Sequence, residues 1–219
     1  MEILQTVADF VLHIDKHLNE VISQYGTLTY AILFFIIFAE TGFVVTPFLP
    51  GDSLIFAAGA LAANEANGLN VHLLAILMIV AAIAGNQLNY AIGRWLGPKV
   101  YEKDYKLIRR SYLERTHKFY EKHGGKTIIY SRFIPIIRTF APFVAGIGDM
   151  PARRFTFFNV AGAVAWVVIF LYVGFYFGNR AEVKNNFSAI IVGIIIISLI
   201  PPVLAFIKVK MEARKAKNS

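Results

Sequence analysis

Two stretches of this chain are longer and more apolar than a soluble fold normally allows. Residues 187–207 contain no charged side chain, and residues 155–178 contain none either, with Asn159 as their clearest polar residue. Each meets the roughly 20 apolar residues that a helix needs to cross a bilayer. Lipid offers the backbone no hydrogen bonds, so such runs fold with their backbone groups satisfied internally. With a third apolar run, they predict transmembrane helices at residues 71–97, 155–178 and 187–208.

The composition supports a membrane protein with several spans. The 219 residues are 57% hydrophobic and 16% charged, whereas soluble domains carry about 25% charged residues. The net charge of +8 does not indicate a nucleic-acid partner, because ten of the 22 basic residues lie within 94–126 and five within 208–217, beside apolar runs. Lys and Arg flank spans on the cytoplasmic side. We therefore expect a cytoplasmic C-terminal tail at 209–219 and an outer loop at 64–70, which has no basic residue.

Two further apolar segments, residues 28–63 and 125–149, contain helix breakers that argue against simple spans. In each, about 11–12 apolar residues precede the breakers, and they reach less than about 20 Å of a hydrocarbon core roughly 30 Å thick. The breakers are Gly42, Pro47, Pro50 and Gly51 in the first segment and Pro135 and Pro142 in the second. Broken backbone at membrane depth must be buried in protein or line a wet cavity. These segments therefore predict two re-entrant hairpins.

Amphipathic segments precede both hairpins. Residues 1–24 repeat apolar side chains at helical spacing, and residues 98–124 contain the capping box Ser111–Glu114. The first helix lies on the membrane surface, on its periplasmic face, or packs against the protein's own helices. The order of amphipathic helix, hairpin and span occurs twice, which predicts an inverted repeat followed by a final span. The two halves show no residue-level match. A rival topology makes residues 27–46 a full span and puts the N-terminus in the cytoplasm.

The hairpins contain four ionisable residues deep in apolar sequence: Glu40, Asp52, Arg132 and Arg138. A charge at membrane depth is costly and faces a partner or a water-filled cavity. Because arginine stays protonated, the two arginines need an anion. One interpretation is that the acidic and basic residues only clamp the hairpins together. We favour the other, in which Arg132 and Arg138 bind an anionic head group and Glu40 or Asp52 exchanges a proton, because buried ion pairs add little stability.

Three motifs give the chain a resemblance to a known family. They are ETG and PFLPGDS within Glu40–Ser53, NYAIGRWLG at Asn89–Gly97, and RFIPIIRTFAPFVAGIG at Arg132–Gly148. Over nearly its whole length the chain resembles the DedA family of bacterial inner-membrane proteins. The resemblance implies a VTT-type fold and movement of undecaprenyl phosphate, another polyprenyl phosphate or a phospholipid across the inner membrane. It also implies a link to envelope integrity and membrane potential.

The resemblance also concerns individual residues. The acidic and basic positions that the family requires correspond here to Glu40, Asp52, Arg132 and Arg138. The family pattern has Gly-Asp before its Asn-Tyr motif, whereas this chain has Gly85-Asn86 before Asn89. If that carboxylate takes part in ion coupling, this chain lacks it. If only a polar contact matters, Asn86 keeps it. Asn86 and Asn89 are thus the polar intramembrane residues to follow.

Three classes of function stay open. The first, which we favour, is a lipid transporter or flippase for an anionic lipid, coupled to H⁺ or Na⁺ or uncoupled. The second is an H⁺ or Na⁺ antiporter that supports the membrane potential, and the third is a structural envelope-integrity protein. We expect no enzyme activity, cofactor or metal. The sequence has no cysteine, no phosphate-binding glycine loop and no HExxH, and the pair His13 and His17 is more typical of a solvated helix face.

Overall fold

The computed structural model describes residues 20–22, 24–43, 51–102, 124–186, 189–190 and 192–194. Most of the first amphipathic segment, residues 103–123, most of the last predicted span and the basic tail lie outside the described residues, as do Pro47 and Pro50. Within them the chain is all-helical, as the sequence predicts. The helices are α3 (Leu28–Gly42), α4 (Gly51–Ala62), the short η1 (Glu65–Asn67), α5 (Val71–Glu102), α7 (Lys126–Ser131), α8 (Pro135–Ile147), α9 (Ala152–Gly178) and α10 (Ala181–Asn185).

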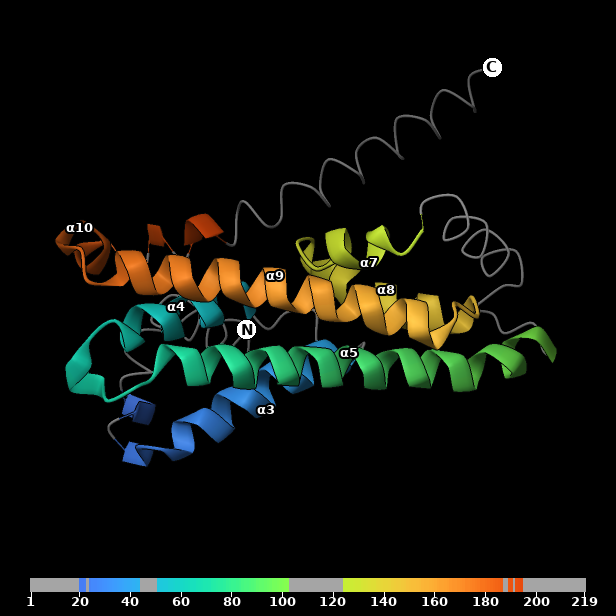
Figure 1. Ribbon diagram of the computed structural model, residues 1–219, viewed down its shortest axis with the longest axis horizontal. Helices are drawn as coiled ribbons and strands as arrows, with labels where there is room; N and C mark the ends of the chain where they lie inside the picture. Colours follow the sequence, from blue (N-terminus) through green and yellow to red (C-terminus); the bar gives the residue numbers. More distant parts are fainter. Residues whose placement is uncertain are drawn as a thin grey trace, which may run out of the picture.

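Two long helices, α5 and α9, form the frame of the bundle and run antiparallel (Figure 1). Both are long and apolar enough to cross a bilayer, over Val71–Gly97 and Ala152–Gly178. At 1.5 Å per residue, each of these 27-residue stretches reaches roughly 40 Å, more than the hydrocarbon core of a bilayer. Helix α5 continues to Glu102, beyond the end predicted at residue 97.

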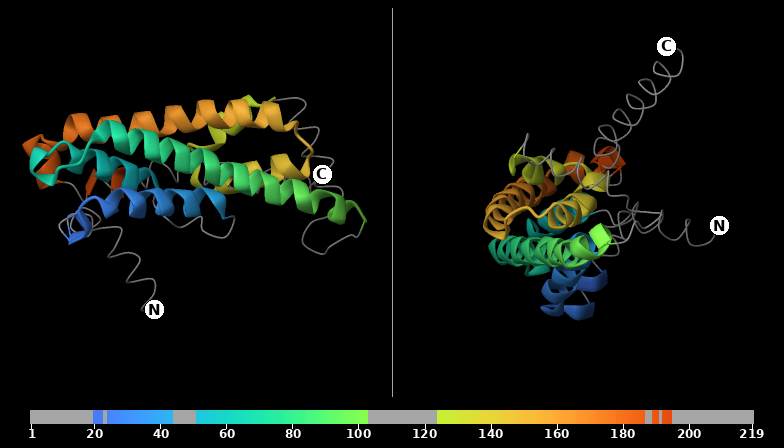
Figure 2. Two further views of the ribbon diagram at one scale, coloured as in Figure 1. Left: turned by 60° about the horizontal axis from the view of Figure 1, so that its bottom comes forward. Right: turned by 90° about the vertical axis from the view of Figure 1, so that its right-hand side faces the viewer.

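The other main helices are too short to cross alone. Helix α3 has 15 residues, α4 has 12, α7 has 6 and α8 has 13, so the longest reaches roughly 22 Å. The α3–α4 pair lies toward the end of the bundle where α5 begins, and the α7–α8 pair lies toward the opposite end (Figures 1 and 2). Paired short helices at opposite ends are the arrangement that two hairpins require. Their re-entry into a bilayer stays a prediction.

Three of the predicted breakers stand at helix ends. Gly42 is the last residue of α3, Gly51 is the first residue of α4, and Pro135 is the first residue of α8. A proline is tolerated in the first helical turn because its missing N–H would have no intrahelical partner there. The chain therefore changes direction in the second hairpin at residues 132–134, before the proline.

The prediction for Pro142 is wrong, because α8 continues through it to Ile147. A proline at this position removes the hydrogen bond to the carbonyl of Arg138, four residues earlier. Helices in membrane bundles tolerate such a gap where neighbouring helices supply other hydrogen bonds. In this turn, the Asn89 side chain of α5 donates to the Thr139 carbonyl at 2.8 Å. This bond goes to the neighbouring carbonyl and not to that of Arg138, so it holds α8 against α5 without replacing the missing backbone hydrogen bond.

The first half of the described chain consists of α3, α4 and α5, and the second of α7, α8 and α9. In each half the second short helix packs against the long helix of the other half. Helix α4 packs along α9, and α8 packs along α5. The first helices stay with their own halves, because α3 packs on α5 and α7 packs on α9. Seen along the bundle, α3 lies on the side of α5 away from α9 (Figure 2). The two halves are therefore interlocked rather than stacked as separate units.

The α4–α9 crossing depends on two glycines. Helix α4 contains the sequence Phe56-Ala57-Ala58-Gly59, and a Cβ on Gly59 would lie 2.0 Å from the Leu171 carbonyl oxygen of α9. A Cβ on Gly174 of α9 would lie 2.1 Å from the Phe56 carbonyl oxygen. Small residues let membrane helices approach this closely, since any side chain would separate the backbones.

The α5–α8 crossing repeats the same arrangement. Helix α8 contains Phe143-Val144-Ala145-Gly146, and a Cβ on Gly146 would lie 2.2 Å from the Tyr90 carbonyl oxygen of α5. A Cβ on Gly93 of α5 would lie 2.1 Å from the Phe143 carbonyl oxygen. Each crossing thus joins a Phe-x-Ala-Gly helix to a helix with glycines four residues apart, Gly93 and Gly97 or Gly174 and Gly178.

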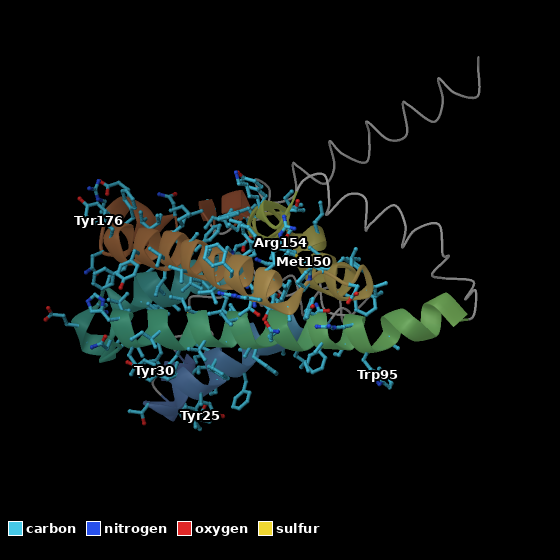
Figure 3. All side chains as sticks on the ribbon, turned by 45° about the vertical axis from the view of Figure 1, so that its right-hand side comes forward. Tyr25, Tyr30, Trp95, Met150, Arg154 and Tyr176 are labelled. Carbon is cyan, nitrogen blue, oxygen red and sulfur yellow. The ribbon has the colours of Figure 1, made fainter. Side chains whose placement is uncertain are left out.

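Large apolar side chains cover the outside of the bundle, as lipid contact requires. Phe35, Ile76 and Phe157 are exposed, and a soluble monomer rarely leaves so much apolar surface uncovered. Aromatic side chains mark both ends, with Tyr176 near one end of α9 and Trp95 toward the opposite end of the bundle (Figure 3). Tyr and Trp are enriched at the two interfaces of a membrane. The exterior is therefore that of a membrane protein.

Candidate functional site

The four charged residues singled out in the sequence are all buried inside the bundle. Glu40 is 1% exposed, Asp52 6%, Arg132 0% and Arg138 3%. They come from different elements: Glu40 from the end of α3, Asp52 from the first turn of α4, Arg132 from the residue after α7, and Arg138 from α8. Three of them meet in one ion-pair network, and Arg132 has different, uncharged hydrogen-bond partners.

Arg138 links α8 to α3 and α4 through both carboxylates. Its Nη1 donates to Asp52 Oδ1 at 2.5 Å, and its Nη2 donates to Glu40 Oε1. Trp166 of α9 closes this group, because its Nε1 donates to the same Asp52 oxygen at 2.7 Å and its ring lies 4.7 Å from the Arg138 guanidinium carbon. The contacts of Arg138 are therefore those of the first interpretation, in which the charged residues clamp the short helices together.

Local backbone structure places both carboxylates at the start of α4. Asp52 lies in the first turn, and the Glu40 carboxylate lies against Gly51, the first residue of the helix. A Cβ on Gly51 would lie 1.9 Å from Glu40 Oε2, so glycine makes this approach possible. The N-terminus of a helix favours negative charge because its first N–H groups point outward. The helix start and Arg138 together stabilise two buried negative charges.

Arg132 has no carboxylate within hydrogen-bond reach among the described residues. Its Nη2 donates to Asn159 Oδ1 of α9 at 2.6 Å and to the Ala82 carbonyl of α5 at 3.3 Å. Asn86 accepts from the same nitrogen at 2.9 Å when its amide is oriented with the oxygen toward the guanidinium. Nε and Nη1 have no partner in the described part of the chain. All its partners are therefore neutral, and all are on one nitrogen.

Asn89 connects α3 and α8 to the first long helix, α5. Its Nδ2 donates to the Thr139 carbonyl of α8 at 2.8 Å and to the Thr41 carbonyl of α3 at 3.4 Å. These threonines directly follow Arg138 and Glu40 in the sequence. One buried amide thus sets the backbone positions of two of the charged residues, and its Oδ1 has no hydrogen-bond partner among the described residues.

Sequence reasoning missed two contributors from α9. It noted Asn159 only as a polar residue and did not single out Trp166, whereas both are fully buried beside the arginines. They are seven residues apart, two helical turns, and so share one face of α9. Gly162, between them on that face, leaves room for Arg132, because a Cβ there would lie 3.0 Å from Arg132 Cδ. A search for polar and small residues at this spacing would have found the face.

Trp166→Phe is expected to lower the stability of the bundle by about 1.5 kcal/mol. The charged Asp52 carboxylate loses the hydrogen bond that Trp166 Nε1 donates to it, and hydrogen bonds to charged groups contribute about this much. Thermal unfolding of the purified protein in detergent measures the change. Trp95→Phe is the matched control, since Trp95 is 65% exposed, and surface changes usually stay within about 0.5 kcal/mol. Equal melting temperatures for Trp166→Phe and Trp95→Phe would show that the hydrogen bond from Trp166 does not stabilise the ion-pair network.

The described residues include no group of three or more His, Cys, Asp or Glu side chains that could hold a metal ion. His13 and His17 lie outside the described residues. The polar groups at this site are carboxylates, guanidinium groups and amides. Carboxylates can bind cations and exchange protons, and guanidinium groups can bind anions.

Known proteins resemble this chain over most or nearly all of its length. A VTT domain matches residues 49–176, which include Asp52 and both buried arginines. Protein DedA of Escherichia coli K12 is 55% identical over 217 residues, covering 99% of each chain. An uncharacterized membrane protein of Mycobacterium tuberculosis is 36% identical over 89% of this chain and 86% of its own. Inner membrane protein YqjA of Escherichia coli K12 is 37% identical over 72% of this chain and 70% of its own.

No solved structure matches the chain. The domain match covers more than half of the sequence, and the similarity to Protein DedA extends from end to end. The family that the motifs suggested is therefore confirmed. This chain belongs to the DedA family of membrane proteins, which carry the VTT domain.

Proposed function

We propose that the protein is a multi-pass transporter of the bacterial inner membrane that moves an anionic lipid between the leaflets. Undecaprenyl phosphate, a related polyprenyl phosphate or a phospholipid is the substrate. The observation that carries the proposal is Arg132, a fully buried cation whose partners are neutral and whose Nε and Nη1 have no partner among the described residues. A cation kept at membrane depth needs an anion, and a phosphate head group is one that a lipid brings.

The carboxylates supply a means of ion coupling. Glu40 and Asp52 share one guanidinium, that of Arg138, so the group has one negative charge in excess when both are ionised. Binding one H⁺ or Na⁺ balances it. An anionic head group bound at Arg132 favours that balance, because it repels the excess negative charge of the network in a medium of low polarity. Lipid movement is thereby linked to the uptake of a cation.

The proposed architecture is an inverted repeat of two re-entrant hairpins with the site between their tips. The two equivalent glycine crossings support it, since α4 on α9 and α8 on α5 use the same residue pattern. Sites in such repeats lie near the middle of the bilayer. The positive-inside rule orients the protein with its C-terminal tail in the cytoplasm and the N-terminal helix on the periplasmic face.

Ion antiport without lipid transport is the second candidate. The observation that favours it is the burial of Glu40 and Asp52 beside one shared arginine, because intramembrane carboxylates often relay ions. In that case Arg138 tunes the carboxylates and no lipid enters. A third, structural role would make the charged network a clamp alone.

Proteoliposomes that carry a fluorescent undecaprenyl phosphate in both leaflets test the proposal. A membrane-impermeant quencher removes the outer signal, and lipid transport makes the inner signal accessible with time. We expect the intact protein to raise this rate at least tenfold over empty liposomes, and Arg132→Gln to abolish the increase. Arg180→Gln, an exposed arginine on the outer surface, is the matched control and should keep it.

The same vesicles separate the three candidates. A pH-sensitive dye inside reports proton flux. Proton or sodium flux without lipid movement would favour antiport and contradict the lipid transporter. Movement of neither lipid nor ions, with folded protein in the vesicles, would favour the structural role.

A further inference from the structure

We propose that Arg132, held by Asn86 and Asn159, is the binding site for the phosphate group, and that Arg138 takes no part in holding it. The site accepts one phosphoryl group of a lipid monoester in preference to a diphosphate. This inference rests on the proposed function, because it names the head-group chemistry and the residue that receives it.

Arg138 is already neutralised. Its two Nη atoms each donate to a different carboxylate, and both carboxylates are buried with it. The Nε of Arg138 has no hydrogen-bond partner among the described residues either. A phosphate that used it would lie beside two carboxylates, because each Nη already donates to one of them, and like charges repel strongly in a medium of low polarity. The ion-pair network therefore opposes a second anion at Arg138.

Arg132 has donors to offer. A guanidinium has five N–H groups, one on Nε and two on each Nη, so the atoms without a partner carry three of them. The described groups around Nη2 are two side-chain amide oxygens and a backbone carbonyl. These neutral acceptors orient the guanidinium without cancelling its charge. Arginine does not escape a buried site by deprotonation, so the charge remains available to an anion.

The amides of Asn159 and Asn86 hold the guanidinium from one side. Asn159 is itself fixed, because its Nδ2 donates to the Ile83 carbonyl of α5 at 3.1 Å. The Asn86 nitrogen, in the orientation described above, lies 3.2 Å from the Thr41 carbonyl of α3. Both amides therefore direct oxygen, not N–H, toward Arg132. They position the arginine, and the phosphate contacts the arginine rather than the amides.

Charge sets the preference for a monoester. One guanidinium matches one phosphate by bidentate hydrogen bonds. A second phosphoryl group brings further negative charge, and the only other buried arginine of the described residues is the one occupied by Glu40 and Asp52. A diphosphate would therefore leave charge without a partner at membrane depth, which is costly.

Trp166 can report occupation of the site. Its ring centroid lies 6.0 Å from the Arg132 guanidinium carbon, and the chain has only one other tryptophan, Trp95. A Trp95→Phe protein, purified at full length in detergent, is therefore titrated to equilibrium with farnesyl phosphate while its fluorescence is recorded. We expect a saturable change with farnesyl phosphate, none with farnesol, and at least tenfold weaker binding of farnesyl diphosphate.

Three variants in this background assign the phosphate to one arginine. Arg132→Gln should weaken farnesyl phosphate binding at least tenfold. Asn159→Asp should do the same, because it puts a carboxylate 2.6 Å from Arg132 Nη2; it serves as the test if Arg132→Gln does not fold. The triple variant Glu40→Gln, Asp52→Asn, Arg138→Gln removes the ion-pair network as a neutral set and should keep binding within threefold.

Other results would overturn the inference. Loss of binding in the triple variant with retention in Arg132→Gln would assign the phosphate to Arg138. An equal response to farnesol would show that only the apolar tail binds, and equal affinity for the diphosphate would contradict the preference for one phosphoryl group. Binding that depends on Arg132 without lipid movement in proteoliposomes would contradict the proposed function alone. If the intact protein moves lipid but Arg132→Gln and Asn159→Asp bind farnesyl phosphate as well as the parent, this inference alone would be contradicted.

Discussion

Arg138→Ala is expected to remove most of the folded protein from the membrane. The substitution leaves Glu40 and Asp52 buried without the guanidinium that both accept from. Breaking a buried ion pair by removing one partner costs roughly 3–5 kcal/mol, a large part of the stability of a typical domain. The amount of monodisperse protein extracted in mild detergent, relative to the wild type, measures the loss.

Neutralising the carboxylates should restore what Arg138→Ala removes. With Glu40→Gln and Asp52→Asn in the same chain, no charge remains in the network, so at least half of the wild-type amount should return. Arg180→Ala, which removes an exposed arginine, should accumulate normally. Normal accumulation of Arg138→Ala itself would show that the network does not hold the hairpins together and would return Arg138 to the candidates for ligand binding.

Gly59→Ala and Gly93→Ala are expected to destabilise the bundle by similar amounts, about 3 kcal/mol each. The added methyl group would lie 2.0 Å from the Leu171 carbonyl oxygen in the first case and 2.1 Å from the Phe143 carbonyl oxygen in the second. A backbone oxygen cannot rotate away as a side chain can, so the helices must separate. Overpacking of this kind costs about 1–3 kcal/mol, and both clashes belong to the upper end. Thermal unfolding in detergent measures the loss.

Gly193→Ala is the matched control for both crossings. A Cβ at Gly193 would meet no atom within 4 Å, and alanine favours the helix over glycine by about 1 kcal/mol. The melting temperature of this variant should stay level or rise. If only one of the two crossing variants loses stability, the equivalence of the crossings is wrong.

The sequence predicted which charges are buried because burial follows from a local contrast. An ionisable residue inside a long apolar run must lie in the interior of the bundle or in a cavity. Glu40, Asp52, Arg132 and Arg138 were found on that ground alone. Which anion pairs with which cation could not be found in the same way. Arg138 is 86 residues from Asp52 and 98 from Glu40, and the pattern around Arg132 offers the carboxylates an equally suitable partner.

Three of the predicted helix breakers lie at helix ends, and one does not. Gly42, Gly51 and Pro135 stand at helix ends, as their conformational preferences predict. Pro142 lies within α8, which packs along α5, although its conformational preference alone predicts a break. The two Phe-x-Ala-Gly sequences escaped notice for a related reason. A four-residue pattern that occurs twice in an apolar chain is not significant by itself. It becomes informative only because the structure shows that each copy contacts a pair of glycines on the opposite helix.

The interlocking of the halves has a consequence for biogenesis. Helix α4 is synthesised well before α9, the helix it packs on, and Asp52 precedes Trp166 by 114 residues. At the usual speed of translation the carboxylates of the first hairpin wait on the order of 4–20 s for Arg138 to emerge. An isolated carboxylate held in lipid avoids its charge by keeping a proton. A carboxylate that ionises as Arg138 arrives would then release its proton, so the ion-pair network can form only after the second half of the chain has been made.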